Sequence, residues 1–219
     1  MTGVTVLLKR DLFGTVTLHE QPGGAPPSVC RDVAAAARWT RPLARLLAAR
    51  ESRALRTLDG LDGIPRLLRA DRWRLEREYI AGRPMQLAQP RDPRYFRTAL
   101  RLLRRMHRRG VVHNDLAKEP NWLVTDSGDP ALVDFQLALV SRRRGRWFRA
   151  LAHDDLRHLL KHKRHYLPQR LTARQRRILQ RSSWIARAWM TIGKPIYRFV
   201  TRRLLGWADR EGAGDRELR

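Results

Sequence analysis

Two short stretches of the chain carry side chains whose types and spacing suit the transfer of a phosphoryl group. The first, Gly110–Trp122, contains Asp115, Lys118 and Asn121, and the second places Asp134 directly after an apolar run. A carboxylate such as Asp115 can accept the proton of an attacking hydroxyl, and the Lys118 ammonium can stabilise charge on the phosphoryl group in transit. The carboxylate of Asp134 and the amide oxygen of Asn121 are oxygen ligands of the kind that hold Mg²⁺ on the phosphates of ATP.

The sequence between these two stretches predicts how they meet. The apolar runs Trp122–Val124 and Ala131–Val133 flank Thr125–Pro130, a segment rich in turn residues. This pattern predicts a β-hairpin. A hairpin at this point brings both carboxylates and the asparagine to the ends of short strands, so we expect them to converge on one cleft.

The order of these residues resembles the catalytic and metal-binding loops of protein-kinase-like enzymes, in which His-x-Asp, a Lys and an Asn are followed by Asp-Phe-Gly. The resemblance is closest to RIO-type kinases and to the bacterial lipopolysaccharide-core (Kdo/heptose) sugar kinases. It implies that Asp115 is the catalytic base, that Lys118 assists transfer, and that Asn121 and Asp134 bind Mg²⁺ with ATP as the phosphoryl donor. His113 is implied to be a structural residue that supports the loop.

Two departures from the family pattern stand out. Asn121 lies six residues after Asp115, one more than in the pattern, and Gln136 replaces the Gly of Asp-Phe-Gly. A one-residue bulge at Pro120 would absorb the first departure. The second removes a position that favours positive φ, so a flipping activation segment is not expected.

The first part of the chain is expected to form a nucleotide-binding β-sheet. The runs Val4–Leu8 and Thr15–Leu18 predict a hairpin, and by resemblance its Gly14 lies where a glycine-rich loop covers the phosphates. Ser28–Asp32 is predicted to be a strand. The resemblance places Arg31 where the family has its phosphate-gripping Lys; the alternative is an exposed arginine on an edge strand.

A helix is predicted over Arg38–Leu58, because apolar residues recur at steps of three and four. The apolar face is formed by Leu43, Leu46, Leu47, Ala54, Leu55 and Leu58. By resemblance, Glu51 on this helix pairs with Arg31; the alternative is a solvated glutamate paired with Arg53 or Arg56.

A strand pair is predicted at Arg66–Ala70 and Trp73–Ile80. The residues from Glu78 to Pro84 resemble the kinase hinge, where main-chain groups of residues such as Glu78 and Ile80 would bind adenine; the alternative is an ordinary strand end and turn. Gly82 marks a lobe boundary, with an N-lobe at 1–82 and a C-lobe at 83–219.

The rest of the chain is expected to be helical. Pro93–Arg109 has one apolar face, and His153–Tyr166 carries Asp155, which by resemblance accepts hydrogen bonds from the loop backbone near His113. Shorter helices are predicted at Thr172–Leu179, Ser182–Met190 and Pro195–Trp207.

The charge of the chain predicts contact with polyanions. The 219 residues include 46 Lys and Arg against 21 Asp and Glu, a net charge of +25, and Ser141–Arg219 alone carries 22 against 6, a net of +16. A coding bias towards arginine is the alternative explanation. The basic and aromatic stretch Ser141–Arg149 is either a membrane- or nucleic-acid-binding element or a solvated loop. One cysteine, no signal peptide and no spanning segment predict a cytoplasmic protein, with peripheral contact at the inner membrane.

These observations predict an α+β, protein-kinase-like two-lobed fold formed by one domain, 1–219. The predicted function is an ATP- and Mg²⁺-dependent kinase whose acceptor hydroxyl belongs to a protein Ser/Thr or to a lipopolysaccharide-core sugar. A nucleotide-binding pseudokinase remains an alternative, favoured by Arg31, by the sparse glycines and by the Asn121 spacing. A nucleic-acid-binding protein ranks last, because the aromatic residues are not arrayed as in known readers of nucleic acid.

Overall fold

The computed structural model describes residues 4–20 and 25–180. The chain divides into two compact units, Met1–Leu179 and Gln180–Arg219, and all but the first residue of the second unit lies outside the described residues. The helices predicted at Ser182–Met190 and Pro195–Trp207 lie there too, so a single domain spanning 1–219 stays a prediction.

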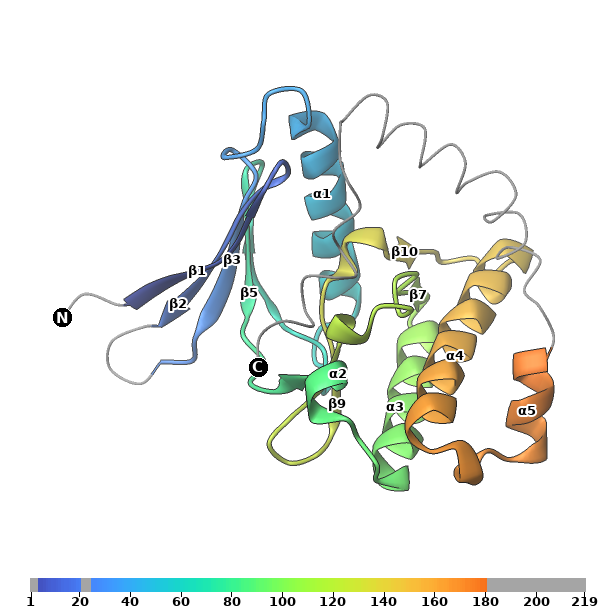
Figure 1. Ribbon diagram of the computed structural model, residues 1–219. Coiled ribbons are helices and arrows are strands. Elements are labelled where there is room, and N and C mark those ends of the chain that lie inside the picture. Colours follow the sequence, from blue (N-terminus) through green and yellow to red (C-terminus); the bar gives the residue numbers. More distant parts are fainter. Residues whose placement is uncertain (1–3, 21–24, 181–219) are drawn as a thin grey trace, which may run out of the picture. The chain divides into compact units, whose positions relative to one another are not determined.

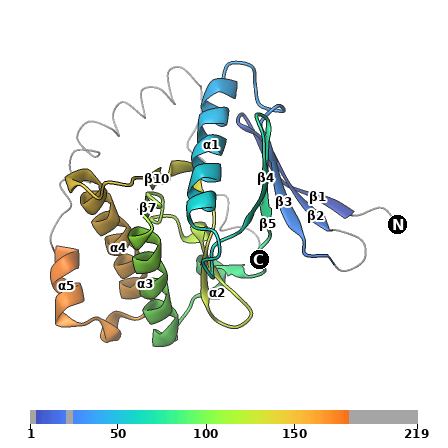
Figure 2. The ribbon, with the colours of Figure 1, turned by 180° about the vertical axis from the view of Figure 1, so that it is seen from behind.

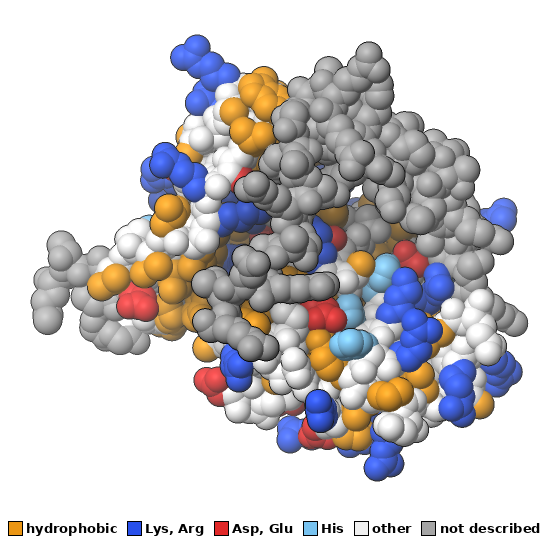
Figure 3. Space-filling model, viewed as in Figure 1, with side chains coloured by type: hydrophobic (Ala, Val, Ile, Leu, Met, Phe, Trp, Pro, Cys, Tyr) orange, Lys and Arg blue, Asp and Glu red, His pale blue; other side chains and the backbone are white. Residues whose placement is uncertain are grey.

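An antiparallel five-stranded sheet forms the first part of the first unit (Figure 1). Its strands run in the order β1-β2-β3-β5-β4, with the bounds β1 Val4–Asp11, β2 Gly14–Glu20, β3 Ser28–Asp32, β4 Leu67–Ala70 and β5 Arg74–Glu78. These strands confirm the hairpin predicted from the first two apolar runs, the strand predicted at Ser28–Asp32, and the strand pair predicted at Arg66–Ala70 and Trp73–Ile80. β1 is an edge strand, and its apolar side chains lie exposed along the sheet in Figure 3.

Helix α1 (Arg41–Thr57) runs alongside this sheet and contacts β4 and β5 (Figures 1 and 2). Ala54 and Leu55 of this helix are fully buried. Only this C-terminal half of the predicted apolar face is in the core, since Leu43 and Leu46 are 48% and 51% exposed. The periodicity therefore identified the helix correctly but assigned the wrong residues to the buried face of its first half, where Ala44 is buried instead.

The second part of the unit is mainly helical. Its helices are α2 Met85–Ala88, α3 Pro93–Arg108, α4 Arg146–Tyr166 and α5 Ala173–Gln180, with 3-10 turns η1 Glu119–Asn121, η2 Phe135–Leu137 and η3 Pro168–Arg170. Short strands join them: β6 Arg83–Pro84, β7 Val111–Val112, β8 Trp122–Val124, β9 Pro130–Leu132 and β10 Leu139–Val140. β8 and β9 form the predicted hairpin, with Trp122 opposite Leu132.

One prediction about this region is wrong. The helix expected to begin at His153 begins at Arg146, so the end of the basic stretch Ser141–Arg149 is helical rather than a loop. Phe148 is buried and its ring lies edge-on to His107 of α3, whereas Trp147 is 67% exposed. Packing of Phe148 against α3 explains the extra turns, which the run of arginines conceals in the sequence.

The main hydrophobic core connects α1, which packs beside the sheet, to the helical part of the unit. Residues of α1, α3 and the β7–β10 region form one buried cluster, in which Trp122, Tyr95 and Phe135 are the largest side chains. The buried polar atoms of the first two are satisfied, because the Trp122 indole donates to the Leu116 carbonyl (3.3 Å) and the Tyr95 hydroxyl donates to the Leu123 carbonyl (3.1 Å). The loop that carries Asp115 is therefore tied to the core at Leu116 and through the strand that follows it, β8. No helix in the described residues is long and apolar enough to cross a membrane.

Candidate active site

The loop between α3 and β8 begins at a glycine that tolerates no side chain. Gly110 lies two residues beyond the end of α3 with φ +78°, and a Cβ there would collide with the carbonyl oxygen of Ser141. The Gly110 carbonyl in turn accepts a hydrogen bond from the Ser141 N–H (2.8 Å). This close approach joins the start of the loop to the end of β10, so the two predicted motifs are fixed to each other at their outer ends.

Asp155 of α4 fixes the backbone of this loop through hydrogen bonds. Its carboxylate accepts the main-chain N–H groups of His113 (2.9 Å) and Asn114 (2.9 Å), and it also accepts Nε2–H of His107 (3.1 Å). Asp155 is 1% exposed, so these donors replace the water that a buried carboxylate needs. Asn114 has φ +65°, and the two-pronged contact with Asp155 holds the backbone in that unfavourable conformation.

His113 links the loop that carries Asp115 to the stretch that carries Asp134. Its Nε2–H donates to the carbonyl of Val133 (3.0 Å), and its ring lies 4.5 Å from the ring of Phe135 between centroids. His113 is fully buried. These contacts are those of a residue that supports the loop, which is the place that the resemblance gave it.

Asp115 lies beside both of its expected neighbours. Lys118 Nζ is 3.2 Å from Asp115 Oδ2, and Nδ2 of Asn121 donates to the same oxygen (3.1 Å) and to the main-chain carbonyl of Asp115 (2.9 Å). Burial raises the pKa of Asp115 above its ordinary value, while the Lys118 charge and both side-chain hydrogen bonds act in the opposite direction. The result is a desolvated carboxylate with one oxygen engaged.

The additional residue between Asp115 and Asn121 is taken up by a tight turn. Residues Glu119–Asn121 form the 3-10 turn η1, with Pro120 at its second position. The side chain of Glu119, the first residue of this turn, accepts a hydrogen bond from the Tyr166 hydroxyl (2.8 Å) and lies 3.6 Å from His162 Nδ1. The longer spacing therefore leaves Asn121 within hydrogen-bonding distance of Asp115.

Asp134 follows β9 with a left-handed backbone, φ +65° and ψ +68°. Gln136, which replaces the expected glycine, donates from Nε2 to Asp134 Oδ1 (2.5 Å), and Nη2 of Arg31 lies 4.0 Å from the same atom. Burial raises the pKa of Asp134, but the Gln136 hydrogen bond and the positive charges around it outweigh burial and hold that pKa below its ordinary value. Asp134 is thus a stable anion.

A buried carboxylate connects α1 to two strands of the sheet, β3 and β5. Glu51 of α1 is 1% exposed and lies 3.4 Å from Nε of Arg31 on β3 and 3.4 Å from Nε of Arg77 on β5. The expected proximity of Arg31 and Glu51 is present. Arg77 was not singled out from the sequence; burial lowers its pKa, which the charge of Glu51 opposes.

The main-chain groups of Glu78, one of the residues expected to form the hinge, already have hydrogen-bond partners. The Glu78 N–H donates to the Arg66 carbonyl (2.8 Å), and the Glu78 carbonyl accepts Nη1 of Arg77 at 3.5 Å. Ile80 lies in the irregular segment between β5 and β6. A ligand that uses the hinge would therefore meet the main chain around Ile80 more readily than that of Glu78.

Gly14 allows β2 to pack closely against β3 and does not belong to a free loop. It has φ +124°, and a Cβ there would collide with the carbonyl oxygen of Asp32 on β3. The adjacent Phe13 packs on Val33, Ala36 and Ala44. The turn that was expected to cover the phosphates is therefore fastened to the segment between β3 and α1.

The oxygen ligands available suit a hard cation that shares its coordination with phosphate. In the part of the chain that the structure describes, no group of three or more His, Cys, Asp or Glu could hold a metal by itself. Asp134 and Asn121 offer one carboxylate and one amide oxygen, and Mg²⁺ characteristically binds one or two protein oxygens together with phosphates and water. These side chains therefore fit Mg²⁺ bound to a nucleotide.

Comparison with known proteins decides the family. The model of the phosphotransferase enzyme family matches residues 16–143, more than half of the chain. The chain belongs to this family. The match begins within β2 and runs past the end of β10, so it includes Arg31, Glu51, Asp115, Asn121 and Asp134 of this member of the phosphotransferase enzyme family, but not the β1–β2 turn at Gly14.

The fold is that of protein-kinase-like enzymes, as predicted. The crystal structure of the Rio2 kinase from Chaetomium thermophilum matches with a TM-score of 0.60 and 14% sequence identity, covering 82% of this chain and 62% of that one. The chain thus spans about three fifths of the length of that structure. A search of curated proteins finds no match. The predicted α+β class and the RIO-like resemblance are confirmed, and the acceptor is not shown by either comparison.

Proposed function

We propose that this phosphotransferase moves the γ-phosphoryl group of Mg·ATP to an acceptor hydroxyl, with Asp115 as the general base. The observation that supports this most strongly is the partly desolvated Asp115 carboxylate, with Lys118 at 3.2 Å and Asn121 at 3.1 Å. Both contacts reach Oδ2, so we assign Oδ1 as the atom that accepts the proton of the acceptor. A raised pKa makes Asp115 a stronger base than a solvated aspartate.

The remaining residues position the donor. Lys118 is close enough to Asp115 to neutralise charge that develops on the phosphoryl group beside it. Asp134 and Oδ1 of Asn121 would hold Mg²⁺, which supplies charge neutralisation on the β- and γ-phosphates when it is bound. Arg31, fixed by Glu51 and close to Asp134, would contact the phosphates as a fork of N–H donors.

The acceptor is either a protein Ser/Thr or a lipopolysaccharide-core sugar. The basic character of the chain favours an acidic acceptor presented at the cytoplasmic face of the inner membrane, since each Lys or Arg near anionic lipid is worth about 1 kcal/mol. Lys and Arg side chains are spread over the helical part of the described residues (Figure 3). Peripheral membrane contact is proposed on the same ground.

Transfer of label from ATP tests this proposal. The purified protein is incubated with γ-labelled ATP and Mg²⁺, alone, with a protein substrate mixture, and with cell-envelope fractions. We expect label in one acceptor class, and none with Asp134→Ala, because the cation then loses its anionic ligand. Absence of label from every acceptor with the folded wild type would reject the proposal.

A nucleotide-binding pseudokinase is the second candidate, and one contact favours it. Gln136 already occupies Asp134 Oδ1 at 2.5 Å, and Arg31 contributes positive charge nearby, so the carboxylate is stabilised without a cation. A pseudokinase would show a thermal shift with ATP and no turnover. Equal ATP-induced shifts with Mg²⁺ and with EDTA would support it.

A further inference from the structure

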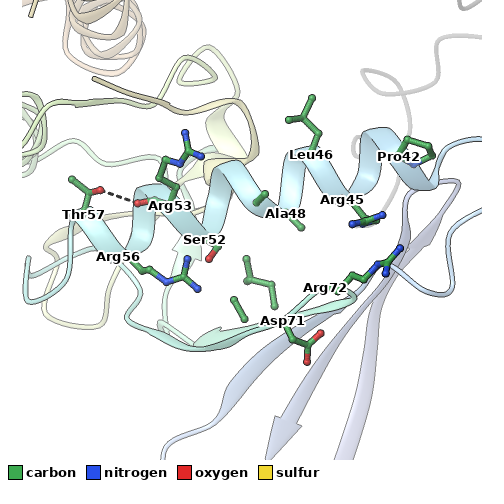
Figure 4. Close-up of a pocket in the computed structure, with 13 residues that line it drawn as sticks. Pro42, Arg45, Leu46, Ala48, Ser52, Arg53, Arg56, Thr57, Asp71 and Arg72 are labelled. Carbon is green, nitrogen blue, oxygen red and sulfur yellow. Dashed lines mark hydrogen bonds between the residues drawn. The ribbon is translucent and has the colours of Figure 1, made fainter. Parts of the chain in front are cut away.

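A groove of about 690 Å³ lies on the side of α1 that faces the turn between β4 and β5. Figure 4 shows its walls: Arg45, Ser52 and Arg56 project from α1, and Asp71 and Arg72 lie at the β4–β5 turn. None of these residues has a role in the proposed phosphoryl transfer. The groove is therefore separate from the loops that carry Asp115 and Asp134.

The rim of the groove is positively charged. Arg45, Arg53 and Arg56 of α1 and Arg72 of the turn are all exposed. The guanidinium carbons of Arg45 and Arg72 lie 5.3 Å and 5.0 Å from the centre of the Trp73 ring, on which they are held by cation–π contacts. Arginines held in this way lose less conformational entropy when an anion binds between them.

The one acidic residue among the described residues that line the groove is already engaged. Asp71 Oδ1 accepts the main-chain N–H groups of Trp73 (2.8 Å) and Arg74 (2.9 Å), and Oδ2 lies 3.6 Å from Arg69. The two backbone hydrogen bonds lower the pKa of Asp71. Asp71 therefore shapes the turn and does not neutralise the arginines of the rim.

The floor of the groove is small and apolar, with one polar atom. Ala48, Ala49, Ala70 and Leu75 contribute its hydrocarbon surface. Ser52 is 5% exposed, and its buried hydroxyl has no hydrogen-bond partner within the described residues. A buried hydroxyl without a partner is unfavourable, so a ligand that supplies a hydrogen bond here would be stabilised.

We propose that this groove binds an acidic segment of a partner protein, with an apolar side chain on the alanine floor and carboxylates on the arginine rim. A free anion would leave the apolar floor uncovered. A second copy of this chain, with a net charge of +25, would be repelled by the rim. An acidic, partly apolar peptide matches both surfaces and offers main-chain groups to Ser52.

Occupancy of the groove would act on the active site through α1. Ser52 follows Glu51 directly, and the Glu51–Arg77 pair (3.4 Å) joins the two elements, α1 and β5, that also form the groove. A segment bound between them would hold α1 against the sheet and keep Glu51 beside Arg31. This step rests on the proposed function, whereas the binding itself does not.

Fluorescence anisotropy with a capped, labelled hexapeptide, Glu-Asp-Phe-Leu-Asp-Glu, tests the binding at physiological salt. Its matched control, Glu-Asp-Ser-Ser-Asp-Glu, has the same charge and no apolar side chain, so it reports non-specific attraction to a basic protein. We expect the apolar peptide to bind about tenfold more tightly than the control, since two apolar side chains leave water.

Variants locate the site. Arg45→Glu with Arg56→Glu should weaken binding about tenfold, and Ala49→Trp should block the floor without changing charge. Arg50→Glu, an exposed arginine of α1 that does not line the groove, is the control and should bind nearly as the wild type does. Thermal unfolding checks that each variant is folded. Equal binding of the two peptides, or equal losses in the groove variants and in Arg50→Glu, would overturn the proposal.

The effect on catalysis is measured separately, as Mg·ATP turnover with and without the peptide. We expect an increase in the wild type that is absent in Ala49→Trp. A folded wild type without any turnover would count against the proposed function. It would not affect the docking site, which the anisotropy measurement tests independently. Turnover that is unchanged by saturating peptide would reject the coupling through α1.

Discussion

Replacing Glu51 with glutamine should destabilise the protein strongly. The carboxylate is 1% exposed and lies 3.4 Å from both Arg31 and Arg77, which are 15% and 13% exposed. Glutamine keeps the volume and removes the charge, so two largely buried guanidinium groups lose the carboxylate between them and retain only Asp134, 4.0 Å from Arg31. Removing one partner of a buried ion pair costs about 3–5 kcal/mol.

The expected shift in melting temperature follows from that energy. A unit of this size changes its Tm by about 2–4 °C per kcal/mol, so Glu51→Gln should lower Tm by roughly 6–20 °C. Burial already lowers the pKa of Arg77, and the loss of Glu51 removes the nearby charge that opposes this. The lower half of the range is expected, because both arginines retain some solvent.

Thermal unfolding followed by circular dichroism measures this effect. Arg50→Gln is the matched control, since Arg50 is an exposed charge on the same helix and surface substitutions usually change stability by about 0.5 kcal/mol or less. A Tm for Glu51→Gln as close to the wild type as that of the control would show that the three charges do not form the buried cluster described above.

The catalytic loop and the basic part of the chain give three further tests. Asp115→Asn should slow single-turnover transfer by about 10²–10⁴-fold and leave ATP affinity unchanged; parallel losses of rate and affinity would instead make Asp115 a structural or metal-binding residue. Lys118→Ala should move the acid limb of kcat/KM to higher pH, because Lys118 lowers the already raised pKa of Asp115 and the base works only when ionised; an unmoved limb would contradict the base assignment. Sedimentation should show binding to anionic liposomes that weakens with salt, given the net charge of +16 over Ser141–Arg219; equal binding to neutral liposomes would exclude this mechanism.

Sequence patterns predicted most of the elements because their signals are local. Alternation and β-branching predicted the strands, and apolar steps of three and four predicted α1 and α3. The start of α4 was missed, since Gly145 gives no side-chain cap and a run of arginines precedes Phe148. Only the packing of Phe148 against α3, which is a long-range contact, extends that helix.

The candidate site was predicted where motif spacing is informative, and less well where sheet register decides. Arg77 lies in a run of alternating charges that reads as an exposed strand. In the sheet, Arg31 is opposite Leu75, and Arg77 points to the same face two residues further on, towards Glu51. Likewise, that Gly14 packs against Asp32 depends on how closely β2 approaches β3, which no short motif encodes.

The buried position of Phe135 has a consequence for small-molecule inhibitors. Phe135 is fully buried, its ring packs on His113, and the 3-10 turn that follows Asp134 places Gln136 where a glycine would ease backbone rotation. Moving a phenylalanine out of a core costs about 3–5 kcal/mol when the space is not refilled. Compounds that need Phe135 displaced should therefore lose about 10²–10⁴-fold in affinity relative to compounds confined to the proposed adenine site at the hinge. Selectivity profiling with matched pairs of such inhibitors would separate this protein from kinases whose Asp-Phe-Gly segment turns over readily.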